Sequence, residues 1–167
     1  MWAKQKGFTI VELLIVIVII GILAAITIVA YNGIQQRSRD AQVISGVEVY
    51  RKALKSYEIV NSAYPTATGC LGASYPADQC WQGDSGNRVV SATLDANLAS
   101  FMSAKPTLAT SLMSIGITNN IRAGALYVTS PSRIIYYLSG PSRPCVISGA
   151  SGITEGGVVT QCALTLP

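Results

Sequence analysis

The stretch of sequence that decides the fold is Lys6-Gly7-Phe8-Thr9-Ile10-Val11-Glu12, followed by an apolar run that reaches Tyr31. Between positions 13 and 30 the only polar side chain is the hydroxyl of Thr27. About 20 apolar residues span a hydrocarbon core of about 30 Å, so residues 8–31 are long enough to cross a membrane. The sequence therefore predicts a transmembrane helix over this range.

The charges around the run predict its orientation. Lys4 and Lys6 precede it, and the next basic residue is Arg37. Because positive charge favours the cytoplasmic side, the N-terminus is expected in the cytoplasm and the rest of the chain outside it. A secretory signal peptide would have an apolar core of 7–15 residues and a small-residue cleavage site, whereas this run is longer and lacks a clean site. A plain signal anchor explains the run but not the acid at its start.

That acid is Glu12. A charge near the centre of a membrane helix costs about 2.5–3.5 kcal/mol on insertion scales, so an acid in such a segment is a functional hypothesis by default. The alternative is that the side chain extends toward the lipid headgroups from a position near the helix start. The functional hypothesis requires a cationic partner for Glu12.

The residues around Glu12 resemble the processing site of type IV pilins and pseudopilins. The resemblance rests on the run from Lys6 to Leu14 and on Gly21-Ile22-Leu23-Ala24-Ala25-Ile26. It implies that a prepilin peptidase cuts between Gly7 and Phe8 and that Phe8 becomes the methylated N-terminus. It also implies that Glu12, the fifth residue of the mature chain, acts in assembly. Residues 1–7 are then a leader peptide.

The implied cut supplies a partner for the acid. Removing residues 1–7 exposes an α-amino group on Phe8, which is mostly protonated at neutral pH and keeps its charge when methylated. A nearby opposite charge stabilises an ionised carboxylate, so Glu12 is expected to face the terminus of a neighbouring subunit. Many pilins carry a proline at the position of Val29. Without it, Asn32-Gly33 is the weak point of the helix, and either a local break or an intact helix is expected there.

A helical pattern continues beyond the membrane segment, and Tyr64-Pro65 is expected to end it. Glu48 and Lys52 form a favourable i,i+4 pair on this helix. A coiled-coil partner is an alternative use of the apolar stripe, but no regular heptad is sustained. The sequence thus predicts one helix over residues 8–60 whose outer half packs on a domain. The stripe consists of apolar residues three to seven positions apart: Ile34, Ala41, Ile44, Val47, Tyr50, Leu54 and Tyr57.

The remaining residues, 61–167, predict a globular domain. Residues 65–92 read as an ordered loop because they are rich in Pro, Gly, Ser, Ala and Asp. Residues 93–104 have helical spacing, and residues 108–115 read as a short helical turn. Four short segments rich in Val, Ile and Tyr then predict an antiparallel meander over 125–129, 133–139, 144–148 and 158–163. The fold class is α+β: a long N-terminal helix packed on a small antiparallel sheet, as in pilins.

The four cysteines predict disulfides, because an even number behind a membrane-targeting segment is typical of an oxidising compartment. Four cysteines allow three pairings. Pairing neighbours in sequence gives Cys70–Cys80 within the loop and Cys145–Cys162 across the last two predicted strands. The second pair resembles the disulfide-bounded C-terminal region of many pilins. Free buried cysteines are the alternative.

Composition argues against an enzyme. There is no histidine, which removes His-based triads and the common zinc sites. Asp78, Asp84, Asp95 and Glu155 are scattered without a paired spacing, and the glycines of 149–157 fit a hairpin tip. No Lys/Arg cluster is longer than Arg51-Lys52, so there is no strong signal for nucleic acid. No metal or cofactor is expected.

We therefore expect a structural subunit of a type IV pilus-like filament that forms homo-oligomers through its apolar helix. It is expected in the cytoplasmic membrane before assembly and on the cell surface as part of a pilus afterwards. The resemblance implies a prepilin peptidase, an assembly platform and an ATPase as partners. The alternatives are a pseudopilin of a type II secretion or DNA-uptake system, and a membrane-anchored binding module that does not polymerise.

The first prediction concerns the mature N-terminus. In cells that carry a prepilin peptidase, mass spectrometry of the purified chain should find a terminus at methylated Phe8. The net charge then falls from +4 to +2, because Lys4 and Lys6 leave with the leader. A terminus still at Met1 or Trp2 would exclude processing of the pilin type.

Overall fold

The computed structural model describes residue 7 and residues 9–83, 86–115 and 120–167, with the backbone alone at residues 29 and 30. The chain divides into two compact units, Met1–Arg37 and Ser38–Pro167. The long helix α1, Ile10–Asn61, contributes residues to both. The outer half of this helix thus belongs to the same compact unit as residues 61–167.

Helix α1 passes through Asn32-Gly33 without a break. Of the two alternatives at this pair, the structure has the intact helix. The helix ends at Asn61, whose side chain donates a hydrogen bond to the carbonyl oxygen of Tyr57 at 2.9 Å. Ser62 then takes a left-handed conformation (φ 58°), which turns the chain out of the helical path.

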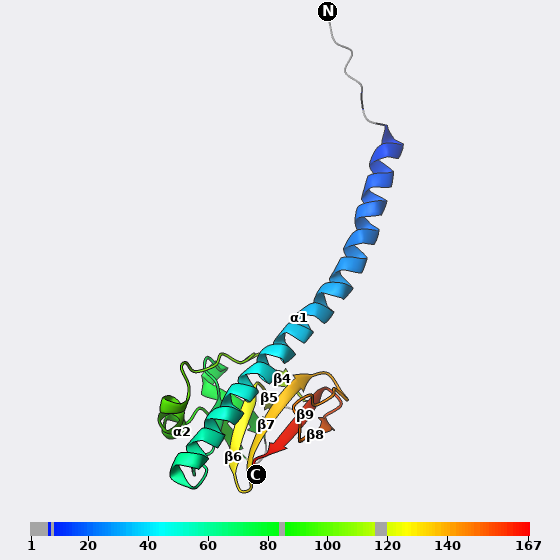
Figure 1. Cartoon of the computed structure of the whole chain (residues 1–167). Coiled ribbons are helices and arrows are strands. Elements are labelled where there is room, and N and C mark those ends of the chain that lie inside the picture. The colour runs from blue at the N-terminus through cyan, green and yellow to red at the C-terminus, as the bar shows by residue number, and fades with distance from the viewer. Residues whose placement is uncertain (1–6, 8, 84–85, 116–119) are drawn as a thin grey trace, which may run out of the picture. The chain divides into compact units, whose positions relative to one another are not determined.

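A five-stranded antiparallel sheet packs beside the outer half of α1 (Figure 1), with the strand order β1-β6-β7-β9-β8. The predicted meander is wrong in one respect, because β9 lies between β7 and β8. Residues of β9 are mostly buried and those of β8 mostly exposed, so the last strand in sequence takes the inner position. The strands are β1 (Gly69–Leu71), β6 (Ala125–Thr129), β7 (Ser132–Ser139), β8 (Ala150–Glu155) and β9 (Val159–Thr165).

The predicted strand 144–148 is also wrong. These residues are irregular, and the strand that pairs with β9 is β8, which begins at Ala150. Pro144 has no backbone N–H to give to a ladder, and Ser142 (φ 53°) turns the chain just before it. Cys145 consequently lies outside the sheet, and its bond to Cys162 ties an irregular segment to β9 where a closed hairpin was expected.

A second antiparallel sheet has four strands in the order β3-β2-β5-β4. Residues 65–92, predicted as a loop, therefore hold β1, β2 and β3 together with the short 3-10 helix η1 (Pro76–Asp78). The predicted helix at 93–104 is present as α2 (Ala92–Leu98) and the 3-10 turn η2 (Ala99–Phe101). The strands of the second sheet are β2 (Gln79–Gly83), β3 (Gly86–Val89), β4 (Met113–Ser114) and β5 (Ile121–Arg122).

The helical turn predicted at 108–115 is wrong, because this segment is extended and ends in β4. Leu108 is buried over Gly46 of α1, where a Cβ would lie only 2.8 Å from the Leu108 Cδ1 atom. An extended segment that follows Pro106 can lay this one side chain on the helix without burying polar neighbours. Gly46 makes the close approach possible because it has no side chain.

Alternate residues of the central strands face two different cores. Tyr127 of β6 and Tyr136 of β7 belong to the core that contains α1. Leu126 of β6 and Tyr137 of β7 belong to the core that contains the Cys70–Cys80 disulfide. This is the period of two expected of a strand, and it explains why both faces of the sheet are apolar.

The apolar stripe of α1 is confirmed only over its middle part. Val47, Tyr50 and Leu54 are fully buried in the core, while Ala41 and Ile34 are exposed. Val43 and Ala53, which the prediction omitted, complete the buried face. Glu48 forms its ion pair with Arg51, at 2.9 Å, and not with Lys52 as predicted. Arg51 also lies about one helical turn from Glu48, and its guanidinium group reaches the carboxylate.

The second prediction tests this packing. Leu54→Ala should lower the free energy of unfolding of the second unit by about 2–5 kcal/mol, because Leu54 is 0% exposed and its truncation leaves a cavity. Ile59→Ala is the matched control, since Ile59 lies on the same helix and is 70% exposed; its effect should stay within about 0.5 kcal/mol. Urea unfolding of the full chain in detergent measures both. Equal effects would contradict the assigned core.

Candidate functional site

Glu12 lies in the first turn of α1, and its side chain is hydrogen-bonded to Thr9, the residue just before the helix begins. The backbone N–H and the hydroxyl of Thr9 both donate to Oε2 of Glu12, each at 2.8 Å. In return, the N–H of Glu12 donates to Oγ1 of Thr9 at 3.2 Å, and the N–H of Leu13 donates to the Thr9 carbonyl oxygen at 3.4 Å. This reciprocal arrangement is a capping box, which satisfies backbone N–H groups that a helix start leaves unpaired.

The capping box fixes the position of the carboxylate relative to the helix start. Both bonds use Oε2, and within the described part of the chain Oε1 accepts no hydrogen bond. The sequence prediction considered Glu12 as an ion-pairing acid or as a side chain that extends toward the headgroups, and it missed this capping role. The signal was available, because Thr9 and Glu12 have the T-x-x-E spacing of a capping box.

The proposed cleavage site is described on one side only. Gly7 is exposed, and a Cβ placed on it would have no atom within 4 Å. Phe8, expected to be cut free and methylated, lies outside the described residues, as do Lys4 and Lys6. The leader 1–7 and the roles of Gly7, Phe8 and Glu12 accordingly remain predictions.

The first half of α1 is apolar on all sides. Its large apolar side chains from Ile10 to Ile28 are 50–78% exposed. By length and composition, α1 is the one helix of the described chain that could cross a membrane, a criterion that a signal sequence near an N-terminus also meets. A helix that is apolar all round requires lipid or other apolar helices around it. Thr27, its one polar residue past Glu12, donates its hydroxyl to the Ala24 carbonyl oxygen at 3.0 Å.

Two ion pairs in the second unit, each with one buried partner, were not predicted. Asp40 on α1 accepts a hydrogen bond from the N–H of Ser139 at 2.9 Å and pairs with Arg143 at 3.3 Å. It therefore fastens the end of β7 and the following loop to the helix. A lone acid on a helix gives no sequence signal for this role, because its partners are about a hundred residues away.

The second pair is Arg122 with Glu155. Arg122 Nε donates to both carboxylate oxygens at 3.0 and 3.1 Å, and Nη1 donates to the carbonyl oxygen of Gln82 at 2.7 Å. The guanidinium also lies 4.6 Å from the centroid of the Trp81 ring. Arg122 is thus shielded, and it joins the small sheet to the end of β8.

The acids named in the sequence analysis do not form a cluster in the described residues. The described residues contain no group of three or more His, Cys, Asp or Glu side chains that could hold a metal. Asp95 is paired with Lys105 at 2.6 Å, Asp78 is exposed, and Asp84 lies outside the described residues. Burial raises the pKa of Tyr75 to about 12, so its hydroxyl stays neutral while it donates to the Leu71 carbonyl oxygen.

All four cysteines are bonded. The pairs are Cys70–Cys80 and Cys145–Cys162, the pairing of neighbours in sequence. The first joins β1 to β2, so it holds the two sheets together at one point. The second anchors the segment before β8 to β9.

Comparison with known proteins bears on the N-terminal part of the chain. Residues 2–28 match the model of the prokaryotic N-terminal methylation motif. A type II secretion system core protein G of Dickeya chrysanthemi is 34% identical over 70 residues, which are 42% of this chain and 46% of that protein. A fimbrial protein of Pseudomonas aeruginosa is 45% identical over 69 residues, which are 38% of this chain and 45% of that protein.

A type IV major pilin of Neisseria gonorrhoeae is 39% identical over 75 residues, which are 44% of this chain and 46% of the pilin. The matches thus span about half the length of these relatives. No solved structure matches the chain. The chain carries the N-terminal methylation segment of type IV pilins and pseudopilins, which confirms the resemblance read from its sequence. Its fold, a long apolar N-terminal helix with antiparallel sheets, is of the α+β class and is consistent with the pilin fold.

The third prediction isolates the capping box. Thr9→Val removes the hydroxyl from two of the three bonds and should weaken the helix start by about 1 kcal/mol. Amide hydrogen exchange at residues 10–12, measured on the full chain in detergent, should become about fivefold faster. Thr9→Ser keeps the hydroxyl and should exchange at the native rate. Identical exchange in all three chains would contradict the capping role of Thr9.

Proposed function

We propose that this protein is a structural subunit of a type IV pilus-like filament. The observation that carries the proposal is the exposed apolar helix that lies within the region matching the methylation motif and has the carboxylate of Glu12 in its first turn. Such a helix is stable in a bilayer or among copies of itself. The second unit has its own cores and remains outside the membrane.

Processing precedes assembly in this proposal. The prepilin peptidase cuts between Gly7 and Phe8 and methylates the amine of Phe8. The chain waits in the cytoplasmic membrane with its N-terminus on the cytoplasmic side, and an assembly platform and ATPase then move it into a filament on the cell surface. The relatives named as fimbrial protein and type IV major pilin support this course.

The geometry at the helix start supports a pairing between Glu12 and the amine of a neighbour's Phe8. The capping box occupies Oε2, and the described residues leave Oε1 without a hydrogen bond. A second copy can therefore donate an ammonium group to Oε1 while the capping bonds persist. An ion pair shielded among apolar helices is strong where its remaining oxygens are also hydrogen-bonded, and here Thr9 meets that condition.

A pseudopilin of a type II secretion or DNA-uptake system is the second candidate. The relatives named as type II secretion system core protein G favour it, at 34–39% identity. The two candidates share the processing site and the assembly helix. Electron microscopy separates them, because long surface fibres that contain this chain support the pilus subunit and short fibres or none support the pseudopilin.

The fourth prediction separates the charge of Glu12 from its capping role. Glu12→Leu should leave cleavage and membrane insertion intact and abolish filaments, because removal of one partner of a buried pair typically costs about 3–5 kcal/mol. Glu12→Gln keeps an oxygen for the capping box but loses the charge. It should abolish filaments as well.

The measurements are mass spectrometry of the mature terminus and the yield of sheared filaments. Thr9→Val is the control, since it weakens the cap and keeps the acid; it should still assemble. Normal filament yield from Glu12→Leu would remove the acid from its proposed role. Assembly by Glu12→Gln but not by Thr9→Val would show that the cap, and not the charge, is what assembly needs. If the native chain is processed but stays monomeric in the membrane, the remaining hypothesis is a membrane-anchored binding module that does not polymerise.

A further inference from the structure

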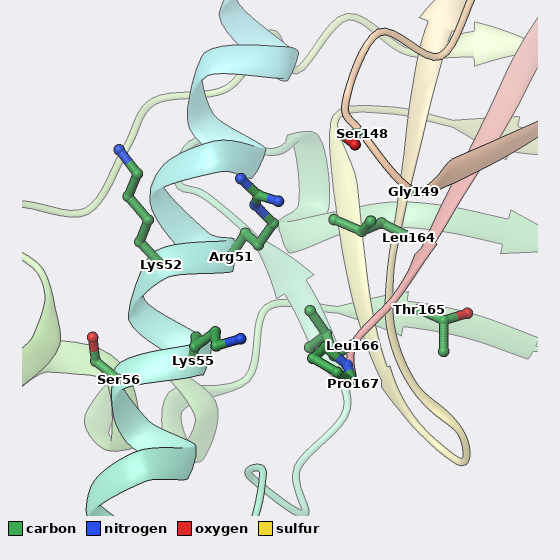
Figure 2. A pocket seen from close by; sticks show the side chains of 10 residues that line it. All are labelled: Arg51, Lys52, Lys55, Ser56, Ser148, Gly149, Leu164, Thr165, Leu166 and Pro167. Carbon is green, nitrogen blue, oxygen red and sulfur yellow. The ribbon is translucent and has the colours of Figure 1, made fainter.

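A cavity of about 570 Å³ opens in the second unit between α1 and the end of β9. Figure 2 shows α1 as one wall, and the last residues of β9 with the loop before β8 as the other. Arg51, Lys52 and Lys55 come from the helix, whereas none of the residues that line the cavity is acidic. The opposite wall combines the hydroxyl-bearing Ser148 and Thr165 with apolar residues such as Leu164.

The three cations differ in direction. In Figure 2 the Arg51 guanidinium and the Lys55 ammonium group point from α1 into the space before β9, and the Lys52 side chain points away from it. Arg51 and Lys55 are four residues apart, a spacing at which like charges destabilise a helix. Arg51 is paired with Glu48 at 2.9 Å, but Lys55 makes no ion pair with any described residue. The cavity therefore favours an anionic group beside Lys55.

If the anionic group beside Lys55 is an acidic side chain of a second copy, most of the acids in the described residues are already in use. Four of them already form ion pairs, namely Asp40, Glu48, Asp95 and Glu155. In the proposed filament Glu12 already pairs with the amine of a neighbour's Phe8, and Glu58 is half-buried on the same helix as Lys55. Asp78 remains: it is exposed and its carboxylate makes no bond to a described residue.

Asp78 is also held rigidly. It ends η1, where Ala77 (φ 51°) and Asp78 (φ 55°) turn the chain sharply. Its N–H donates to the Tyr75 carbonyl oxygen at 3.0 Å, and its own carbonyl oxygen accepts from Val90 at 2.8 Å. The turn lies within the ring closed by Cys70–Cys80. A fixed acid of this kind loses little conformational entropy when it binds.

The two sites lie on opposite sides of the five-stranded sheet. Tyr75 and Cys80, which flank η1, belong to the core on the face away from α1, whereas the cavity is lined by α1 itself. One copy therefore cannot bring Asp78 to its own Lys55. A contact between two different patches is head-to-tail, and such contacts build open helical assemblies when they do not close into a ring.

We propose that this basic cavity receives Asp78 of a second copy, so that Arg51 and Lys55 of one subunit hold the acid of the next. The inference rests on the proposed filament and adds a contact of the globular units to that of the apolar helices. Leu164 and the other apolar wall residues partly exclude water and strengthen the pairing.

The first test uses the native full chain. Filaments grown from an equal mixture of normal and ¹⁵N-labelled chains are treated with a carbodiimide, which joins an amine to a carboxylate without a spacer. Mass spectrometry should find a Lys55–Asp78 peptide in which the two parts carry different labels. The same treatment of membrane-embedded monomers should not give it. Filaments in which Lys55 links only to Glu58 of its own chain, or to nothing, would overturn the inference and leave the proposed function standing. If the native chain forms no filaments, both fail.

The second test reverses charges. Lys55→Glu and Asp78→Lys should each lower filament yield about tenfold, because like charges then face each other, and the double variant should recover most of it. Arg39→Glu is the matched control, because Arg39 is exposed on the same helix and does not line the cavity; its filament yield should stay within about twofold of native. Membrane abundance and intact disulfides report folding, and Lys55→Gln gives a milder loss. Native yields from the single variants, an equal loss in Arg39→Glu, or no recovery in the double variant would each overturn the proposal.

Discussion

The packing of the outer half of α1 on the five-stranded sheet is the contact on which the rest of the second unit depends. Val47, Tyr50 and Leu54 are fully buried in it, and each such side chain contributes about 1.5–3 kcal/mol relative to exposure. The Tyr50 hydroxyl also accepts a hydrogen bond from the N–H of Gly72 at 2.9 Å, which fixes the chain just after β1. Most helix stability in proteins comes from such tertiary packing, so this contact also explains why α1 persists to Asn61.

The two halves of α1 obey different constraints. In the outer half one face is buried and the others carry polar groups, so a sheet alone is a sufficient partner. In the first half every face is apolar and exposed, and a sheet could cover only one of them. The backbone is satisfied in both halves by the helix itself, which is the condition for residence in lipid. One continuous helix can thus have its first half in an apolar environment and its outer half packed on a domain in water, without an interruption at Gly33.

The sequence predicted those features of the structure that depend on residues close together in the chain, and it missed those that depend on long-range contacts. The apolar run, the helix and strands β6 and β7 follow from periodicity within a few residues, and they were correct. The position of β9 between β7 and β8 was not predictable from local patterns, because β9 carries polar residues such as Thr160 and Gln161 and is still the more buried of the last two strands. The burial of Arg122 had no local signal, because the residues that stabilise it, Trp81 and Glu155, are more than thirty positions away in the sequence.

The capping box changes what the acid at the helix start requires. An uncapped Glu12 would need its neighbour's amine at once, and the monomer would hold an unsatisfied charge at the membrane boundary until assembly. With Oε2 bonded twice to Thr9, the carboxylate is partly satisfied in the single chain, and the pairing oxygen Oε1 is already in place. In the proposed filament a neighbour's amine then adds a bond without breaking one. At Glu12 the gain on assembly comes from the new ion pair, so the charge of this residue, and not its geometry, distinguishes the monomer from the filament.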